Sequence, residues 1–447
     1  MGKYFGTDGI RGVANETLDA RLAYLTGFAA ASVVGAGTSG RPRALIGKDT
    51  RVSSDMLEAA LISGLCSGGA DASPLGVLPT PAVAYLARKT GADMGIVISA
   101  SHNPYEYNGI KIFDSLGFKL SDELENEIEQ LIDLPEKLCP RTRAQLGRVV
   151  RGELGEAEYV KHLVRLAHGE YGGIKIAADC SNGASSFTAR RLFRALGADA
   201  KLIHNRPNGV NINQNCGSTH IDSLRRAVTR GGFDVGFAFD GDADRCLIID
   251  ELGGLIDGDA LLAVCARDMK ARGELKNNAV VGTVYSNSGL NEFGGREGVE
   301  VLRSDVGDRN VLEMMLSRGV CLGGEASGHT IFLDDSTTGD GQLAAIKFLN
   351  LIAQTGKTAS ELAADVPRYP QIMLNVPAEP EAKLRKIASR ELADAIEDAK
   401  SSLGGVGYVI VRPSGTESLI RVAVEAETEE KARKIAERLA ELIRAVP

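Results

Sequence analysis

The chain has 447 residues and carries 51 lysines and arginines against 59 aspartates and glutamates, a formal net charge of −8. This acidic balance argues against a protein that binds nucleic acid or anionic membranes through a basic surface. The length corresponds to about three domains, give or take one, and is sufficient for cores that need no disulfide or zinc site for stability.

The amino terminus and the cysteines indicate a cytoplasmic protein. The first residues, MGKYFGTDGIRG, contain no apolar run of the kind that forms a signal peptide. We expect no membrane span, because no stretch of about 18 residues is continuously apolar. The seven cysteines are scattered and never form a CxxC pair, which is typical of reduced thiols rather than of disulfides or zinc ligands.

Three segments of the chain repeat one pattern. They begin at Ala44, Ile174 and Val280, and each runs from an apolar, β-rich stretch through a polar turn into a helical periodicity. Strands that alternate with helices favour parallel or mixed sheets covered by helices. The pattern therefore predicts three related α/β units.

The carboxyl-terminal part has a different pattern. A strand-like IMLNV precedes a charged helix, the strands GYVIVRPS and SLIRVAVEA, and a last amphipathic helix from Glu429, which predicts a small α+β domain. Changes in composition place the four predicted domains at residues 1–150, 151–256, 257–368 and 369–447.

The strongest local signal is DGDADR at residues 240–245, between two apolar strands. Alternate residues of an extended segment point the same way, so the carboxylates of Asp240, Asp242 and Asp244 can converge. Two such charges ~4 Å apart repel by about 4 kcal/mol at an effective dielectric of about 20, and a hard cation such as Mg²⁺ or Ca²⁺ offsets this. A solvated acidic turn is the alternative. An EF-hand fails because Arg245 stands where Gly is needed and the flanks are strands.

A second signal is GIVISASHNP at residues 95–104, a buried strand that opens into a polar loop. The carboxyl end of a strand is where α/β folds place functional residues. Ser101 is a candidate nucleophile, although from position alone a turn cap is the stronger interpretation. No GxSxG elbow surrounds it, and the adjacent His102 is poorly placed for a Ser–His pair.

Two further loops suit anions and sugars. RPSGTE at 412–417 combines an arginine, two hydroxyls and Gly-spaced amides, which favours a phosphate cradle or, alternatively, an ordinary hairpin turn. GGEASGH at 323–329 offers a carboxylate, a hydroxyl and an imidazole to sugar hydroxyls, although a lone histidine is more often structural. The polar loop at 208–220 is expected at the surface by default. A nucleophile, a metal, a phosphate cradle and a sugar loop together indicate phosphoryl transfer.

In this order the motifs resemble those of the α-D-phosphohexomutase superfamily, over the whole chain. The matching segments are FGTDGIRG at 5–12, ISASHNP at 98–104, NGIK at 108–111, NINQNCGSTH at 211–220, DGDADR at 240–245, GEASGH at 324–329 and RPSGTE at 412–417. The first and fourth favour the branch that acts on glucosamine phosphates. The resemblance implies three similar mixed-sheet α/β domains and a smaller C-terminal α+β domain, similar to TATA-binding protein, around a central cleft.

The resemblance also implies roles for individual residues. Ser101 would be the phosphoserine and would bind one Mg²⁺ per chain together with Asp240, Asp242 and Asp244. Glu325 and Ser327 would hold sugar hydroxyls. Residues that support charge and proton transfer would be Arg11, Lys111, Arg245 and His329, with the acid and base among Lys111 and His329 left open. The ligands of the non-reacting phosphate would be Arg412, Ser414, Gly415, Thr416 and Arg421.

The implied reaction interconverts glucosamine 6-phosphate and glucosamine 1-phosphate through a 1,6-bisphosphate. This bisphosphate would also activate the enzyme, and the product would feed the synthesis of UDP-N-acetylglucosamine and of the cell wall. The expected partner is thus a small sugar phosphate, with no nucleic acid and no membrane, and the sequence leaves a homodimer open. The chain departs from the usual pattern in small ways. Ala326 stands where the glucosamine branch usually carries Gln, YEYN at 105–108 lacks the usual Asp before its Asn, and IDSL at 221–224 lacks the common Pro. A phosphomannomutase or phosphoglucomutase with the same mechanism, a metal-dependent sugar phosphatase and a non-catalytic binding protein stay open as alternatives.

Overall fold

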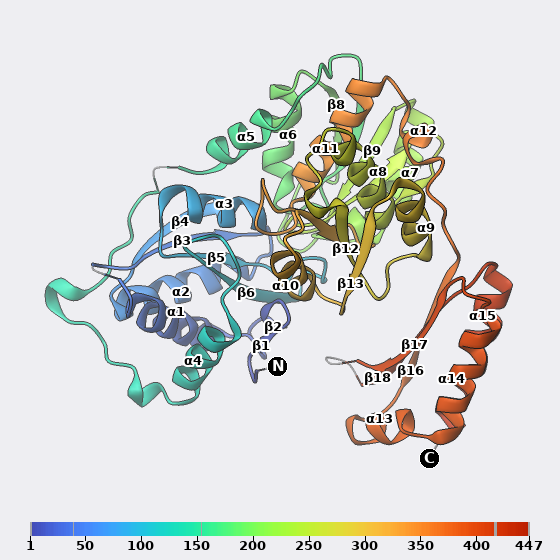
Figure 1. Ribbon diagram of the computed structural model, residues 1–447. Coiled ribbons are helices and arrows are strands. Elements are labelled where there is room, and N and C mark those ends of the chain that lie inside the picture. The colour runs from blue at the N-terminus through green and yellow to red at the C-terminus, as the bar shows by residue number, and fades with distance from the viewer. Residues whose placement is uncertain (1, 39, 153, 415–417, 446–447) are drawn as a thin grey trace.

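The computed structural model describes residues 2–38, 40–152, 154–414 and 418–445, and not the side chain of Pro380. Four sheets follow one another along the chain (Figure 1). No helix in these ranges is long and apolar enough to cross a bilayer.

The first domain is built on a six-stranded sheet with the order β1-β2-β6-β5-β3-β4. Strand β3 pairs in parallel with β4 and β5, whereas β6 and the two strands beyond it are antiparallel. Because β3 and β5 are parallel, the loops that follow them leave the same edge of the sheet. The elements are β1 (Phe5–Gly6), β2 (Gly9–Val13), α1 (Ala20–Gly35), β3 (Arg43–Lys48), α2 (Ser54–Gly68), β4 (Asp71–Val77), α3 (Thr80–Thr90), β5 (Met94–Ile98), β6 (Tyr107–Asp114) and α4 (Asp122–Asp133), followed by the 3₁₀ turns η1 (Pro135–Lys137) and η2 (Arg143–Gln145).

The second domain has a five-stranded sheet with the order β11-β10-β9-β7-β8. Strand β7 lies parallel to β8 and β9, and β10 returns antiparallel beside β9. The loop between β9 and β10 therefore lies at the same edge as the loop after β7. The elements are α5 (Glu156–Arg165), β7 (Lys175–Asp179), α6 (Ser185–Ala195), β8 (Asp199–Ile203), η3 (Gly217–Thr219), α7 (Asp222–Gly231), β9 (Val235–Phe239), β10 (Cys246–Asp250) and β11 (Leu255–Ile256).

The third domain has a four-stranded mixed sheet, and the tail has a three-stranded antiparallel sheet with the order β16-β18-β17. The third domain contains α8 (Gly258–Ala271), η4 (Lys276–Asn278), β12 (Ala279–Thr283), α9 (Ser288–Glu297), β13 (Glu300–Ser304), α10 (Asp308–Arg318), β14 (Leu322–Gly324), β15 (Thr330–Phe332), α11 (Gly341–Thr355) and α12 (Ala359–Ala363). The tail contains β16 (Gln371–Pro377), α13 (Pro380–Ile387), α14 (Arg390–Ser402), β17 (Tyr408–Pro413), β18 (Leu419–Glu425) and α15 (Glu429–Ala445).

The predicted fold class is confirmed. Each of the three repeated segments forms a strand, a loop and a helix, namely β3–α2, β7–α6 and β12–α9. The tail is α+β as predicted, with an antiparallel sheet and three helices. The exact boundaries at residues 150, 256 and 368 stay predictions.

The apolar cores show which domains are packed together. One continuous apolar cluster runs from the α3 side of the first sheet through the second and third domains, and includes Leu86, Phe237 and Leu322. The tail has a cluster of its own around Val422 and Leu439. In Figure 1 the tail stands apart from the domain that contains β1 and β2. Among the described residues, no hydrogen bond or ion pair joins these two parts. The first three domains therefore form one body, to which the tail is attached separately.

Helices α1 and α2 pack through two glycines that allow a very close approach. A Cβ on Gly64 would lie 2.0 Å from the Tyr24 carbonyl oxygen, and one on Gly27 would lie 2.4 Å from that of Leu61. Both neighbouring atoms belong to helical backbone, which cannot turn away as a side chain can. The spacing of the two helices therefore depends on the absence of side chains at these two positions.

We expect Gly64→Ala to lower the free energy of unfolding by about 1–3 kcal/mol or more, because one methyl group forces α1 and α2 apart. Urea unfolding measures the change. Gly295→Ala is the matched control, since Gly295 is an exposed helical glycine with open space around it. The control substitution should be neutral or stabilise by up to about 1 kcal/mol. Equal effects of the two substitutions would contradict the packing argument.

Candidate active site

The predicted phosphoserine loop follows β5, where the sheet edge faces the second domain. Ser101 is fully buried, and its backbone has a left-handed φ of 52°. Its Oγ donates a hydrogen bond to Asp240 Oδ2 at 2.6 Å, across 139 residues of sequence. A left-handed conformation is unfavourable for a non-glycine residue, so the surrounding contacts must hold it. The loop thus presents the Ser101 hydroxyl to the aspartates.

Arg51 holds this loop, although the sequence analysis did not single it out. Its guanidinium donates to the carbonyl oxygens of Ser101 at 3.0 Å and Asn103 at 2.8 Å, and also to that of Pro104. Arg51 pairs with Asp49 at 2.8 Å, and both side chains are fully buried. Both residues lie in the loop after β3, which leaves the sheet beside the loop after β5. Only this parallel pairing brings Arg51 to Ser101.

The polar loop at 208–220 is partly buried, so the expected surface position was wrong for its middle. Ile212, Asn213 and Cys216 are buried. The Asn213 side chain donates to the carbonyl oxygens of Ser101 at 2.8 Å and Asn103 at 3.0 Å. The buried Asn213 is polar because it supplies hydrogen bonds to the loop of Ser101, whereas Gln214 and Asn215 beside it are exposed.

Asp179, at the end of β7, binds the loop after β7 and the polar loop at 208–220 through its carboxylate. It accepts hydrogen bonds from the backbone amides of Ser181 at 2.9 Å and Gly217 at 3.0 Å, and its Oδ2 lies 2.9 Å from His204 Nδ1. Cys216 lies near enough for the three side chains to resemble a metal site. The carboxylate is already occupied by these donors, so Asp179 is a structural acceptor.

Asp240, Asp242 and Asp244, here called the aspartate triad, converge as predicted. A carboxylate oxygen from each lies within 4.8 Å of the others, and all three side chains are buried. The predicted reason was wrong, because the segment is a turn between β9 and β10 rather than an extended strand. Ala243 has a left-handed φ of 57°, and this turn brings the three side chains together. The flanking antiparallel strands also exclude an EF-hand.

The electrostatics of the aspartate triad are those of an unbalanced buried cluster. Burial, and then the charges of Asp244 and Asp242, raise the pKa of Asp240 well above its usual value. Burial also acts to raise the pKa of Asp244, but Lys111 and then His329 and Arg245 lower it well below its usual value. Ionised Asp240 is therefore costly unless a further positive charge lies beside it.

The residues of the triad fit a hard divalent cation. The Oδ1 atoms of Asp242 and Asp244 are buried and have no hydrogen-bond partner among the described residues. Buried carboxylate oxygens without donors carry a desolvation cost that a cation offsets. An all-oxygen set of ligands is the kind that Mg²⁺ and Ca²⁺ prefer. The acidic triad can thus hold a metal ion.

Lys111 is the main protein cation beside the triad. Its ammonium lies 2.9 Å from Asp242 Oδ2, 2.9 Å from Asp8 Oδ2 and 3.6 Å from Asp244 Oδ2, and the side chain is buried. Burial alone would lower the pKa of Lys111, but these three carboxylates raise it well above its usual value. Lys111 therefore stays protonated in this arrangement and acts as a fixed positive charge.

Asp8 and Thr80 complete this network, and the sequence analysis did not single out either. Asp8 pairs with Arg11 as well as Lys111, and accepts from Lys119 at 2.5 Å. Thr80 Oγ1 donates to Asp242 Oδ2 at 2.6 Å. Asp8 lies within the FGTDGIRG motif, which was the available signal. Thr80 lies in no motif quoted for the family.

His102 lies closer to the reacting atoms than its position next to Ser101 suggested. Its Nδ1 is 3.4 Å from Ser101 Oγ and 3.1 Å from a terminal nitrogen of Arg245. Burial, and then the positive charge of Arg245, lower the pKa of His102 to about 3. The ring is therefore neutral at physiological pH, with Nδ1 as the acceptor toward Arg245.

The predicted sugar loop lies between β14 and β15. Glu325 accepts a hydrogen bond from the amide of Gly307 at 3.0 Å and from the hydroxyl of Ser327 at 3.2 Å. His329 is buried, and its Nε2 accepts from the Gly339 amide at 3.1 Å. Burial acts to lower the pKa of His329, but nearby carboxylates, with Asp244 first, raise it. A second proton on this ring requires the Gly339 amide to move away.

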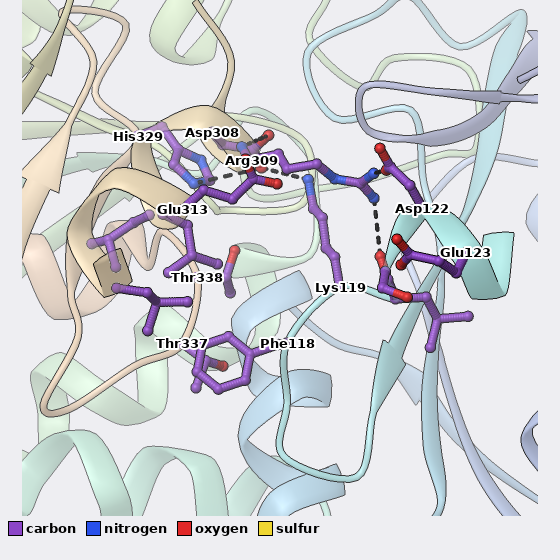
Figure 2. Close-up of a pocket in the computed structure, with 15 residues that line it drawn as sticks. Phe118, Lys119, Asp122, Glu123, Asp308, Arg309, Glu313, His329, Thr337 and Thr338 are labelled. Atoms are coloured by element: carbon purple, nitrogen blue, oxygen red, sulfur yellow. Dashed lines mark hydrogen bonds and ion pairs between the residues drawn. The ribbon is translucent and has the colours of Figure 1, made fainter. Parts of the chain in front are cut away.

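A cavity of about 260 Å³ lies between the first and third domains, beside His329. Figure 2 shows Lys119 reaching across it to Asp308, while Arg309 extends to Asp122. These two cations join α10 to the segment around α4. They tie the third domain to the first along one side of the cavity.

The predicted phosphate cradle is described only in part. Arg412 on β17 and Arg421 on β18 are directly opposite each other, and Ser414 is buried. Gly415 and Thr416 lie outside the described residues. Strands β17 and β18, which carry Arg412 and Arg421, belong to the tail and stand apart from β9, the strand that leads into the aspartate triad (Figure 1).

Four family models match the chain in order. Their descriptions are phosphoglucomutase/phosphomannomutase α/β/α domain I at residues 2–137, domain II at 157–253, domain III at 257–369 and the C-terminal domain at 373–442. A phosphoglucosamine mutase of Clostridium novyi is 49% identical over 444 residues, and one of Acetivibrio thermocellus is 48% identical over the same length. Each alignment covers 99% of both chains.

Solved structures share the fold at lower identity. A phosphoglucomutase/phosphomannomutase family protein of Burkholderia thailandensis has a TM-score of 0.83 at 24% identity, covering 100% of this chain and 98% of that one. Aspergillus fumigatus N-acetylphosphoglucosamine mutase, in complex with GlcNAc-6P and magnesium, has a TM-score of 0.72 at 20% identity, covering 99% and 96%. By its four domain matches and its full-length relatives, the chain belongs to the phosphoglucomutase/phosphomannomutase family, within the α-D-phosphohexomutase superfamily.

Proposed function

We propose that this protein interconverts glucosamine 6-phosphate and glucosamine 1-phosphate, as a phosphoglucosamine mutase does. The observation that carries the proposal is the buried hydrogen bond of 2.6 Å from Ser101 Oγ to Asp240 Oδ2, inside the aspartate triad. The choice of sugar is supported by the phosphoglucosamine mutases that are 47–49% identical over nearly the whole chain.

In the proposed reaction Ser101 carries the phosphoryl group. The free hydroxyl oxygen at C1 or C6 of the sugar attacks the phosphorus of phospho-Ser101, loses its proton to a base and releases the Ser101 oxygen. The resulting 1,6-bisphosphate turns over, and its other phosphate re-forms phospho-Ser101 and leaves a free hydroxyl. Arg11, Lys111 and Arg245 supply positive charge beside the reacting group. Three carboxylates raise the pKa of Lys111, so it places a positive charge beside the reacting group, and the acid and base are sought among Lys111 and His329. We assign His329 to proton transfer, since its ring borders both the triad and the sugar loop.

The aspartate triad and an oxygen of phospho-Ser101 would hold one Mg²⁺. When bound, Mg²⁺ neutralises charge on the transferring phosphoryl group. The orphaned Oδ1 atoms of Asp242 and Asp244 support this ligand set, and a homologous structure contains magnesium. Thr80 and Lys111 orient Asp242 from the other side through Oδ2, which leaves Oδ1 free.

The sugar and its second phosphate would bind between the body and the tail. Glu325 and Ser327 would hold sugar hydroxyls, and Arg412, Ser414, Gly415, Thr416 and Arg421 would hold the non-reacting phosphate. Ala326 contributes no polar side-chain group between the two sugar ligands. A phosphomannomutase or phosphoglucomutase is therefore the second candidate function.

The proposed function predicts preference for glucosamine phosphates over glucose and mannose phosphates by about tenfold in kcat/KM. A tenfold difference in kcat/KM is about the discrimination that one or two hydrogen bonds to the 2-amino group of the sugar can give. The measurement compares the three sugars at one concentration of bisphosphate activator, with free phosphate assayed in parallel. Equal or better rates with mannose or glucose would favour the second candidate, and stoichiometric release of phosphate would favour a phosphatase.

Part of the purified protein should carry phosphate on Ser101, because the hydroxyl is held beside the aspartate triad in a buried loop. Peptide mapping by mass spectrometry locates the group. Ser115, on an exposed turn of the same domain, is the internal control and should be unmodified. Ser101→Ala should reduce kcat to below about a thousandth. Full turnover by this variant, with phosphate found only elsewhere, would refute the mechanism.

Asp242→Asn should reduce kcat by at least about a hundredfold, because it removes a ligand charge from the triad. Without a divalent cation its unfolding free energy should stay within about 2 kcal/mol of the parent, since relief of repulsion offsets the weaker Lys111 contact. Thermal unfolding with and without Mg²⁺ provides a readout besides activity. Mg²⁺ should raise the Tm of the parent and of Asp268→Asn, a surface control on α8, but not that of Asp242→Asn. An unchanged Mg²⁺ response in Asp242→Asn would refute the metal assignment.

A further inference from the structure

Tyr285 of the third domain lies against the open face of the tail sheet. Its hydroxyl oxygen accepts a hydrogen bond from Arg412 Nε at 2.6 Å, and the guanidinium carbon of Arg412 is 5.1 Å from the centre of the tyrosine ring. The Tyr285 carbonyl accepts from the Tyr408 hydroxyl at 3.2 Å and from the Gln371 side chain at 3.2 Å. One residue of the body thus contacts the tail at both ends of β17.

The loop that carries Tyr285 is rigid. It connects β12 to α9, and Arg303 donates to the carbonyl oxygens of Thr283 at 3.0 Å and Ser286 at 2.5 Å within it. Asn287, two residues after Tyr285, also fixes this loop. Its backbone N–H donates a hydrogen bond to Asp259 at 2.7 Å, and its side-chain amide donates one to the Tyr369 carbonyl oxygen at 2.8 Å. Tyr285 therefore projects from a fixed support that also anchors the start of the tail.

The contact leaves the anion-binding edge of Arg412 available. Tyr285 occupies Nε, and among the described residues the two terminal nitrogens of Arg412 have no hydrogen-bond partner. Arg421 is directly opposite on β18. Like charges opposite each other in a sheet destabilise it, and an anion placed between the two arginines relieves this repulsion.

We propose that Tyr285 is a positioning residue for the phosphate cradle: it holds the Arg412 guanidinium by Nε and directs its terminal nitrogens toward the non-reacting phosphate of the sugar. This inference rests on the proposed function and names a group from the third domain that prepares the cradle of the tail. The hydrogen bond and the ring contact both restrict a side chain that otherwise samples many rotamers. Restriction before binding reduces the entropy lost when the phosphate binds.

The contact also links the cradle to the sugar loop. Tyr285 follows β12, and β12 pairs with β14, which leads into the loop of Glu325. The distance between the ligands of the sugar and the ligands of its phosphate is therefore set partly by one tyrosine side chain. The residues proposed to bind the two ends of the substrate are therefore both positioned by the sheet of the third domain.

The test is Tyr285→Phe, which removes the acceptor of Arg412 and keeps the ring. We expect KM for glucosamine 6-phosphate to rise about three- to tenfold while kcat changes less than about twofold, the effect of losing one hydrogen bond that acts on binding. Calorimetry in a Ser101→Ala background should show the same factor in Kd without turnover. An unchanged or lower KM and Kd would overturn the proposal.

Tyr408→Phe is the matched control, because it removes the neighbouring hydrogen bond to the Tyr285 carbonyl without touching Arg412. Its KM should stay within twofold of the parent, and an equal rise would assign the effect to a looser interface and overturn the proposal. In an Arg412→Ala background, Tyr285→Phe should have no further effect on Kd, whereas additive losses would also overturn it. An inactive parent that still binds the sugar phosphate through Tyr285 and Arg412 would refute the proposed function alone.

Discussion

The structure depends on a cluster of buried charges where the first three domains meet. Four carboxylates, those of Asp8 and the aspartate triad, are enclosed with the ammonium of Lys111 and the guanidinium groups of Arg11 and Arg245. Removal of such charges from water costs several kcal/mol each, and only close opposite charges offset this cost. The loops of the first and second domains must therefore meet in one arrangement. A site for phosphoryl transfer needs the same arrangement, because the moving group is an anion beside carboxylates.

Backbone strain is concentrated at this meeting point. Ser101 and Ala243 both have left-handed backbones without being glycine, and each lies at the tip of a loop that faces the other. A Cβ on Gly241 would lie 2.5 Å from the Ser101 carbonyl oxygen, so glycine is needed where the loops touch. Arg51 and Asn213 hold the strained loop by its carbonyl oxygens. These hydrogen bonds offset the free-energy cost of the strained backbone, and neither side chain is placed among the reacting groups.

The predicted site is divided between two parts of the molecule, the body formed by the first three domains and the tail. Ser101 and the aspartate triad lie on loops between strands of domains that share one continuous apolar core. Arg412 and Arg421 of the predicted phosphate cradle lie on a separate small sheet, which is attached through Tyr369, Gln371 and the contacts of Tyr285. A mutase must bind its sugar in two orientations, each with a different phosphate at the cradle. Turning the bisphosphate round exchanges its two ends, so the reaction centre can stay fixed while a separately attached sheet receives either phosphate.

The sequence by itself determined the class of fold and the types of side chain that each loop offers. Apolar strands, polar turns and helical periodicity are local patterns, and they predicted the repeated units, the α+β tail and the convergence of the aspartate triad. Tertiary structure decided which residues complete the site. Thr80 meets Asp242 across 162 residues and Asn213 meets Ser101 across 112, and no local pattern indicates such pairs. Arg51 reaches Ser101 because two parallel strands end at the same edge of a sheet, and Tyr285 reaches Arg412 because the tail folds back onto the third domain. Local sequence sets what a segment can do, whereas the pairing of distant strands sets which segments act together.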